Sequence, residues 1–275
     1  MLNILYIELK KTKPCKQFYR CNIMNDAQHW NKVAENYDKK IFNVFQNDKK
    51  NKLKRYIRKY ANKENTAIDF GCGVGKALPL LSPFFKEIIG IDVSRKCIAI
   101  AKSSPYKNVS FKEADLAGKK IDLPTVDFAF CCNVAMSDDV KRNHSIIKNV
   151  LSTLNKDGVA LFVLPSLESA SLAAWRLISW YDREGTDMGD IPKNELSHMY
   201  VNRQKQITEG IVMIDTVPTK HYLISELYAL FNSGNFVLQK LDRLEYGWET
   251  EFDSPPKWMQ SPYPWDWVIE AKRVK

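Results

Sequence analysis

The sequence predicts an α/β protein with a doubly wound, mostly parallel sheet of seven strands and helices on both of its faces. From residue 66 onward, short apolar runs alternate with amphipathic stretches, which is the pattern of successive strand–helix units. The runs are apolar almost throughout, as in parallel strands that are covered on both sides. Residues 166–220 are too long for a simple connection, so they predict a largely helical cap inserted after the fifth strand.

The individual elements follow from this alternation. The first five strands are expected at 67–70, 87–93, 109–114, 126–134 and 158–165. The helices between them are expected at 75–82, 95–103 and 138–158, and the last of these ends at a glycine. After the cap, residues 221–246 predict a helix, a glycine turn and the sixth strand, and residues 265–274 predict the seventh. The prolines in the loop between these two strands exclude regular structure there.

The chain divides into five parts on the same grounds. Residues 1–23 show no clear period and predict a disordered N-terminal extension, whereas residues 24–64 contain amphipathic helices. We expect the α/β core at 65–165, the cap at 166–220, and the helix and strands that complete the sheet at 221–275. Aromatic residues are frequent in the cap and in the Pro-rich loop, and two interpretations stay open: they line a substrate pocket, or they fill the core beneath the cap. We expect the cap to bind the substrate.

Composition excludes several classes of protein. The chain has 275 residues, of which 45% are hydrophobic and 27% are charged, as in an ordinary globular protein. No apolar run approaches the roughly 20 residues that span a bilayer, and the first residues lack the features of a signal peptide. We therefore expect a cytoplasmic protein without a membrane partner. The six cysteines form no CxxC pair, which disfavours a zinc ribbon, and no other metal site is evident.

The net charge of +9 is concentrated near the N-terminus. Residues 1–65 hold 16 Lys and Arg against 6 Asp and Glu, whereas the remaining residues hold 25 against 26. Much of the excess lies in residues 49–60, where apolar residues at helical spacing predict an amphipathic helix with a basic outer face. Two interpretations stay open: a solvated helix surface, or an electrostatic surface for RNA or another polyanion.

A glycine-rich turn follows the first strand, in the stretch "AIDFGCGVGK". Gly71, Gly73 and Gly75 do not match the dinucleotide fingerprint G-x-G-x-x-G, because its third glycine would fall on Lys76, and no P-loop motif is present. Asp92 ends the second strand, where an acid can accept both hydroxyls of a ribose. Asp115 follows the third strand and is placed to receive the exocyclic amine of a purine. Together these residues predict an adenosine ligand with free ribose hydroxyls.

These motifs resemble those of class I, Rossmann-like S-adenosylmethionine-dependent methyltransferases. The resemblance rests on "AIDFGCGVG", "GIDVS", "EADL" and "CCNVAM", on the lead-in "HWNKVAENYDKKI", and more loosely on "TKHYLISELYALFNSGNFVL". The resemblance covers residues 27–165 well and the C-terminal part more loosely. It implies S-adenosylmethionine as the cofactor, with the N-terminal helices of residues 24–64 covering its site.

The resemblance also implies roles for individual residues. The methionine part would be lined by the turn after the first strand, the ribose and adenine by residues after the second and third strands, and the transferred methyl by the end of the fourth, while a tyrosine closes over the cofactor. In this sequence these positions are Asp69, Gly71, Cys72, Gly73 and Gly75; Asp92 and Val93; Asp115 and Leu116; Asn133; and Tyr37.

The implied chemistry is direct displacement, in which a nucleophile of the acceptor attacks the sulfonium methyl group and S-adenosylhomocysteine leaves. A hydroxyl or protonated amine acceptor needs a base, and His221 and His144 are the candidates. We expect a small-molecule acceptor that is methylated on oxygen or nitrogen. Two alternatives stay open: an RNA or protein methyltransferase that uses the basic helix, and a non-catalytic module that binds S-adenosylmethionine. The sequence does not indicate an oligomeric state.

Overall fold

The computed structural model describes residues 26–37, 41–119, 121–192, 195, 209–214 and 217–275. The extension predicted for residues 1–23 lies outside the described residues. Among the helices in the described ranges, none is long and apolar enough to cross a bilayer.

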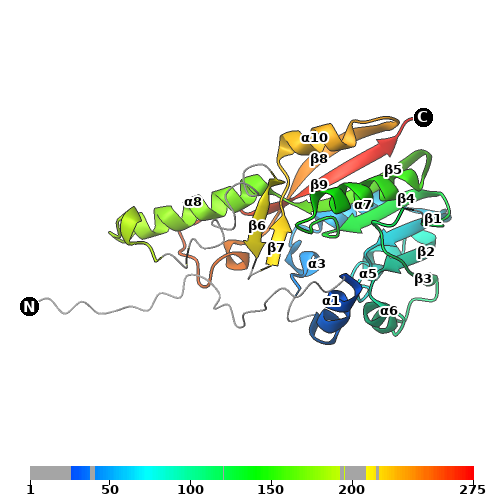
Figure 1. Cartoon of the computed structure of the whole chain (residues 1–275), viewed down its shortest axis with the longest axis horizontal. Helices are drawn as coiled ribbons and strands as arrows, with labels where there is room; N and C mark the ends of the chain where they lie inside the picture. Colours follow the sequence, from blue (N-terminus) through cyan, green and yellow to red (C-terminus); the bar gives the residue numbers. More distant parts are fainter. Residues whose placement is uncertain (1–25, 38–40, 120, 193–194, 196–208, 215–216) are drawn as a thin grey trace, which may run out of the picture.

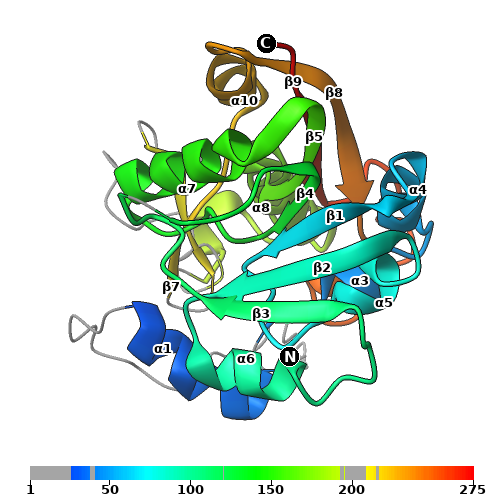
Figure 2. The ribbon, with the colours of Figure 1, turned by 90° about the vertical axis from the view of Figure 1, so that its right-hand side faces the viewer.

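Seven strands form one sheet in the order β3-β2-β1-β4-β5-β9-β8 (Figure 1, Figure 2). β1 to β5 are parallel to one another, and β9 lies between β5 and β8, antiparallel to both. The mostly parallel, seven-stranded sheet predicted from the sequence is therefore confirmed. The strands are β1 (Asn62–Phe70), β2 (Phe85–Asp92), β3 (Val109–Glu113), β4 (Val126–Cys132), β5 (Leu154–Pro165), β8 (Phe236–Glu245) and β9 (Trp265–Arg273).

Helices cover both faces of this sheet, as predicted. On one face, α7 and α10 pack their apolar sides, including Ile147 and Phe231, against the strands. On the other face, α4 and α5 contribute Ile57 and Leu78 to a second cluster. The helices of these two layers and of the N-terminal segment are α1 (Asp26–Val33), η1 (Ala34–Asn36), α3 (Val44–Asn47), α4 (Lys52–Lys59), α5 (Leu78–Leu81), α6 (Arg95–Ala101), α7 (Val140–Ser152) and α10 (Ile224–Phe231).

Several element boundaries differ from the sequence prediction. β1 starts at Asn62 rather than at 67, because its first residues are polar and exposed and so carry no apolar signal. The helix expected at 75–82 is reduced to α5, because Gly75 has a φ of +88° and the residues before Leu78 form turns. The helix expected at 138–158 ends at Ser152, and the strand expected from 158 begins instead at Leu154.

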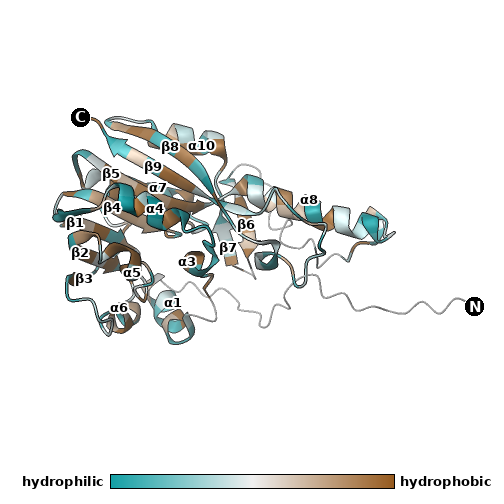
Figure 3. Cartoon of the chain, turned by 180° about the vertical axis from the view of Figure 1, so that it is seen from behind, coloured by the Kyte–Doolittle hydropathy of each residue, from teal (hydrophilic) through white to brown (hydrophobic). Residues whose placement is uncertain are grey.

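The cap segment contains α8 (Leu167–Arg183) and η2 (Met188–Asp190), but also a hairpin of β6 (Ile211–Ile214) and β7 (Val217–Lys220) that the sequence analysis did not predict. α8 projects away from the sheet (Figure 1), and apolar and polar residues are interspersed along its length (Figure 3). A third apolar cluster joins α8 to the Pro-rich loop, in which Trp248 of η4 (Trp248–Thr250) stacks on Phe252 at 5.7 Å between ring centroids.

Candidate functional site

The glycine turn connects the end of β1 to α5 along a path that only glycine follows without strain. Gly71, Gly73 and Gly75 have φ values of +70°, +52° and +88°, in the left-handed region that a Cβ disfavours. The backbone N–H groups of Gly71 and Cys72 donate to the carbonyl of Ile91 at 2.7 and 2.9 Å. The turn is therefore held against the end of β2.

Asp92 ties the turn to the next strand. Its Oδ2 accepts the N–H of Gly73 at 2.8 Å, and its Oδ1 accepts the N–H of Ser94 at 2.7 Å. Burial raises the pKa of this carboxyl, while the two backbone hydrogen bonds oppose the shift. Ser94 in turn caps α6 by accepting the N–H of Cys97. Asp92 thus has a fixed orientation at the carboxyl end of β2.

Asp69 is a buried carboxyl group without a cationic partner among the described residues. It is the last residue but one of β1, and its side chain is 2% exposed. Its Oδ2 has no hydrogen-bond partner among the described residues. Burial, and then the charge of Asp92, raise its pKa to about 7. A buried carboxylate of this kind is stabilised by a cationic ligand.

Tyr37 covers the turn from the N-terminal segment. A Cβ added to Gly73 would lie 2.6 Å from the Tyr37 hydroxyl, so the ring rests directly on the glycine. Burial, and then the charge of Asp92, raise the pKa of Tyr37 far above its usual range, so it stays a neutral phenol. The N-terminal segment is fixed nearby by Asn31 of α1, whose Oδ1 accepts the hydroxyl of Ser94 at 2.8 Å. α1 accordingly lies beside α6 (Figure 2).

Asn133 follows β4 in a left-handed conformation, with a φ of +53°. Its N–H donates to the carbonyl of Val163 in β5 at 2.9 Å, and its side-chain Oδ1 is buried without a partner among the described residues. The side chain thus presents a free acceptor at the carboxyl end of the sheet.

Asp115 has a partner that the sequence analysis missed. Arg142 at the start of α7 binds its carboxylate through two hydrogen bonds of 2.6 and 3.1 Å. This guanidinium contact lowers the pKa of Asp115. Leu116 beside it is buried, and Val93 is half-buried. The spacing of Asp115 and Arg142 gives no signal in the sequence, because the pair joins the loop after β3 to a helix 27 residues later.

Comparisons with known proteins identify the family. A family model described as a methyltransferase domain matches residues 37–207, which is more than half of the chain. The chain belongs to this methyltransferase family. The fold agrees: solved S-adenosylmethionine-dependent methyltransferases from Methanosarcina mazei and Anabaena variabilis superpose with TM-scores of 0.57 and 0.58. Their identities are 21% and 17%, and the matches cover 80% and 96% of this chain and 97% and 98% of theirs.

A curated relative is the probable S-adenosylmethionine-dependent methyltransferase CRG1 of Saccharomyces cerevisiae, 30% identical over 104 residues. The match covers 38% of this chain and 31% of the yeast protein, so the chain spans about a third of the length of that relative. The methyltransferase NodS of Bradyrhizobium japonicum, solved with S-adenosylhomocysteine, has the same fold at 11% identity, with a TM-score of 0.54 and coverage of 90% and 98%.

By family, then, this chain contains a methyltransferase domain, and S-adenosylmethionine is the cofactor of that family. The structure fits that group. Oδ2 of Asp69 is buried without a partner among the described residues, which suits the ammonium of a methionine moiety. The three glycines let the turn pack directly against Val134, Tyr37 and Leu78, where an added Cβ would collide with those side chains.

The two histidines predicted as bases, His221 and His144, belong to different elements of the fold. His221 follows β7 and is buried, with Nδ1 3.0 Å from the carbonyl of Thr219; burial lowers its pKa to about 4. His144 lies on the exposed side of α7. Within the described ranges, neither ring is hydrogen-bonded to Asp69 or Asn133. Their catalytic role stays a prediction.

The sequence analysis missed two residues near Asn133 at the carboxyl edge of the sheet, Tyr246 and Asp266. The hydroxyl of Tyr246 donates to Oδ2 of Asp266 at 2.7 Å, and the amide of Asn133 donates to the same oxygen at 3.3 Å. The only sequence signal was an acid between two tryptophans at the start of the last strand, "WDW". That signal is weak, because the acid's position at the sheet edge depends on β9 running antiparallel to β5.

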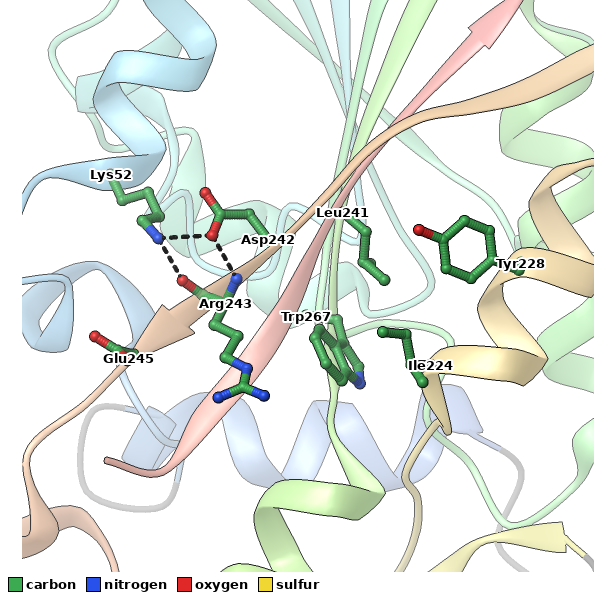
Figure 4. Close-up of a pocket in the computed structure, with 8 residues that line it drawn as sticks. All are labelled: Lys52, Ile224, Tyr228, Leu241, Asp242, Arg243, Glu245 and Trp267. Carbon is green, nitrogen blue, oxygen red and sulfur yellow. Dashed lines mark hydrogen bonds and ion pairs between the residues drawn. The ribbon is translucent and has the colours of Figure 1, made fainter. Parts of the chain in front are cut away.

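A surface depression of about 400 Å³ lies elsewhere, along the outer side of β8 (Figure 4). Its walls include Ile224 and Tyr228 of α10, Trp267, and the ion pair between Lys52 and Asp242. None of its lining residues belongs to the glycine turn, so we assign it no part in cofactor binding.

Proposed function

We propose that this protein transfers the methyl group of S-adenosylmethionine to an oxygen or nitrogen of a small-molecule acceptor by direct displacement. The observation that supports the proposal is the contact of the glycine turn with the acids at the ends of two neighbouring strands, β1 and β2. The N–H of Gly73 binds Asp92, and the buried, unpartnered Asp69 lies beside them. This arrangement offers a carboxylate to an ammonium and a second one to ribose hydroxyls on adjacent strands.

Each part of the cofactor has a proposed binding group. Asp69 would bind the ammonium, with Gly71, Cys72, Gly73 and Gly75 along the methionine chain. Asp92 would bind the ribose through the lone pairs that its two backbone bonds leave free. Val93, Leu116 and Asp115 would border the adenine, with Arg142 orienting Asp115. Tyr37 would close over the sulfonium end, where an aromatic face is favourable for a cation.

When bound, S-adenosylmethionine supplies an electrophilic methyl group. The chain's own contribution is alignment of the acceptor's nucleophile with that methyl group, and exclusion of water by Tyr37 and the cap. Asn133, at the end of β4, would contact the methyl group or the acceptor through its free Oδ1.

The ion pairs that the basic residues of 49–60 form within the protein favour a small-molecule acceptor over RNA. Of the seven Lys and Arg residues in 49–60, four are paired with carboxylates of the chain's own C-terminal region. The pairs are Lys49–Glu249, Lys50–Glu245, Lys52–Asp242 and Lys59–Glu270. More than half of the basic surface is thus neutralised within the fold. An RNA-binding surface needs free cations that neutralise phosphates.

Methyl transfer to two pools of acceptors tests this proposal. Protein with S-adenosylmethionine labelled in the methyl group is incubated with a polar metabolite extract, and separately with total RNA. We expect label in the small-molecule pool and none in the RNA. The charge control is Lys54→Ala with Arg55→Ala and Arg58→Ala, which removes the exposed basic residues of 49–60 that have no ion pair among the described residues, and it should leave transfer unchanged. Label in RNA that this triple variant abolishes would overturn the small-molecule assignment, and binding of the cofactor without transfer to either pool would point to a non-catalytic module.

A further inference from the structure

The carboxyl edge of the sheet carries a row of polar residues in a fixed spatial order. Asp115 follows β3, Asp92 ends β2, Asp69 lies near the end of β1, and Asn133 follows β4. Beyond them come β5 and then β9, whose second residue is Asp266. The register pairs Asp266 with Pro165, the last residue of β5, so this fourth acid lies at the same edge.

The order separates Asp266 from the cofactor. Under the proposed function, adenine, ribose and methionine occupy the ends of β3, β2 and β1 in turn, so the transferred methyl faces β4. Asp266 lies on the far side of Asn133 from Asp69, in the direction from which an acceptor must approach. A carboxylate there is not needed to hold any part of the cofactor.

Asp266 is held so that one oxygen is fixed and the other is available. Tyr246 and Asn133 both donate to Oδ2, at 2.7 and 3.3 Å. No hydrogen bond to Oδ1 occurs within the described ranges, and the residue keeps part of its surface accessible. Burial raises the pKa of Asp266, and the two hydrogen bonds oppose that shift. Within the described ranges no ion pair occupies this carboxyl group, so Oδ1 is the oxygen that a ligand can reach.

The same segment that covers the cofactor turn also covers Tyr246. Phe42 packs edge-on against the Tyr246 ring, with 5.0 Å between centroids, and is itself 44% exposed. The N–H of Ile41 donates to the carbonyl of Tyr37 at 2.9 Å. One N-terminal segment therefore contacts both the glycine turn, through Tyr37, and the Asp266 network, through Phe42.

We propose that Asp266, oriented by Tyr246 and Asn133, is the carboxylate that binds the acceptor's amine or hydroxyl and takes its proton during methyl transfer. The inference rests on the proposed function. In that step the acceptor N–H or O–H bond breaks as the new bond to the methyl carbon forms. The carbon–sulfur bond breaks with its electron pair left on sulfur, and the proton passes to Oδ1 of Asp266 and then to solvent.

Sinefungin provides a probe that needs no knowledge of the acceptor. It is an analogue of S-adenosylmethionine with a primary amine at the place of the transferred methyl group, so its ammonium reports on carboxylates near that place. Calorimetric titration gives its dissociation constant beside that of S-adenosylhomocysteine. We expect wild-type protein to bind sinefungin about tenfold more tightly or better, since a charged contact in a partly buried site contributes more than about 1.4 kcal/mol.

Asp266→Asn keeps the size and the hydrogen-bond acceptor but removes the charge. We expect it to abolish most of the preference for sinefungin while the affinity for S-adenosylhomocysteine changes by less than about threefold. The matched control is Asp157→Asn. Asp157 lies on β5, at the end of the sheet opposite to Asp266; it is largely exposed and pairs with Lys272 of β9. This variant should leave both affinities unchanged. Asp92→Ala should weaken both ligands equally and keep their ratio.

The outcomes separate the two proposals. An unchanged ratio in Asp266→Asn, or no preference in the wild type, overturns the assignment of Asp266 and leaves cofactor binding intact. A folded wild type that binds neither ligand overturns the proposed function itself. If Asp266→Asn does not fold, Tyr246→Phe replaces it. That variant removes the hydroxyl that orients Oδ2, so it should lower the preference about two- to fivefold at constant affinity for S-adenosylhomocysteine, and a ratio equal to the wild type overturns the assignment.

Discussion

The two sides of the candidate site are built in different ways. On the cofactor side, Asp69, the glycine turn and Asp92 lie within 24 residues of sequence and on two adjacent strands. On the acceptor side, Asn133 and Tyr246 both donate to Asp266, and Asn133 and Asp266 are 133 residues apart in the sequence. α8 packs against the Pro-rich loop in the third apolar cluster.

The difference shows which interactions a local sequence motif can specify. A turn that requires three left-handed backbone positions needs glycine at each of them, so its chemistry is visible in the sequence. A carboxylate oriented by two distant side chains needs only the fold to bring them together. We therefore expect changes on the cofactor side to act on cofactor affinity, and changes on the acceptor side to act on stability or on the acceptor.

The largest effect is expected from Trp248→Ala, on the acceptor side. Trp248 is 2% exposed, stacks on Phe252, and donates from Nε1 to the carbonyl of Gln260. Loss of the ring should lower the free energy of unfolding by about 3–5 kcal/mol, measured by urea denaturation. The exposed Trp175 of α8, mutated to Ala, is the control and should cost less than about 1 kcal/mol.

The affinity of folded Trp248→Ala for S-adenosylhomocysteine should stay within about twofold of the wild type, because none of the turn residues contributes to this cluster. A tenfold loss of affinity would show that packing in the third apolar cluster and ligand binding at the glycine turn are energetically coupled.

On the cofactor side, Gly73→Ala should have the largest effect on ligand affinity. The added Cβ would lie 2.6 Å from the Tyr37 hydroxyl and would occupy a left-handed position. The ring must move off the turn, so we expect the affinity for S-adenosylhomocysteine to fall by about 100-fold or more. Gly185→Ala is the matched control: its φ is +77°, but nothing lies within 4 Å of the new Cβ. It should cost stability only, and equal affinity losses in the two variants would contradict the account.

Asp69→Asn should change the pH dependence of stability. The pKa of Asp69 is about 7 in the folded protein against an ordinary value of 3.8, so the folded state holds this proton more tightly than the unfolded chain. The resulting stabilisation is complete below pH 3.8 and is lost as the pH rises through 7. The ligand-free wild type should therefore lose up to ~4 kcal/mol between these pH values from this group.

The Asn variant, which cannot ionise, should lack that loss. Urea unfolding at pH 4.5 and pH 8 measures it, with stability of the variant relative to the wild type rising at the higher pH. The variant should also bind S-adenosylhomocysteine about tenfold more weakly, since the ammonium loses its counter-charge. Parallel pH profiles for the two proteins would contradict an unpaired carboxylate at this position.

The smallest effect is expected from Lys49→Met, which breaks the contact of Lys49 with Glu249 between the N-terminal segment and the Pro-rich loop. Both side chains are more than half exposed, so the change in the free energy of unfolding should be less than about 0.5 kcal/mol. A loss above about 2 kcal/mol, measured by urea denaturation, would show that this loop depends on the basic segment more than exposed pairs allow.

The sequence predicted the fold, and it supplied the residues proposed for the cofactor side, because both depend on local signals. The buried halves of the five parallel strands are visible in the sequence as apolar runs. The turn is visible as three closely spaced glycines, and Asp92 as an acid at the end of a strand. The hairpin of β6 and β7 and the early start of β1 were missed, because their polar or short segments have no clear period. Arg142, Tyr246 and Asp266 were missed because their roles depend on pairings between distant strands and helices.

The most direct test is calorimetric titration with S-adenosylhomocysteine of the wild type beside Asp92→Ala. The account predicts binding in the micromolar range by the wild type and at least about a tenfold loss in the variant, because Asp92 both holds the N–H of Gly73 and faces the ribose. Equal affinities in the two proteins, or no binding by a folded wild type, would contradict the claim that the turn and its two acids form the cofactor site.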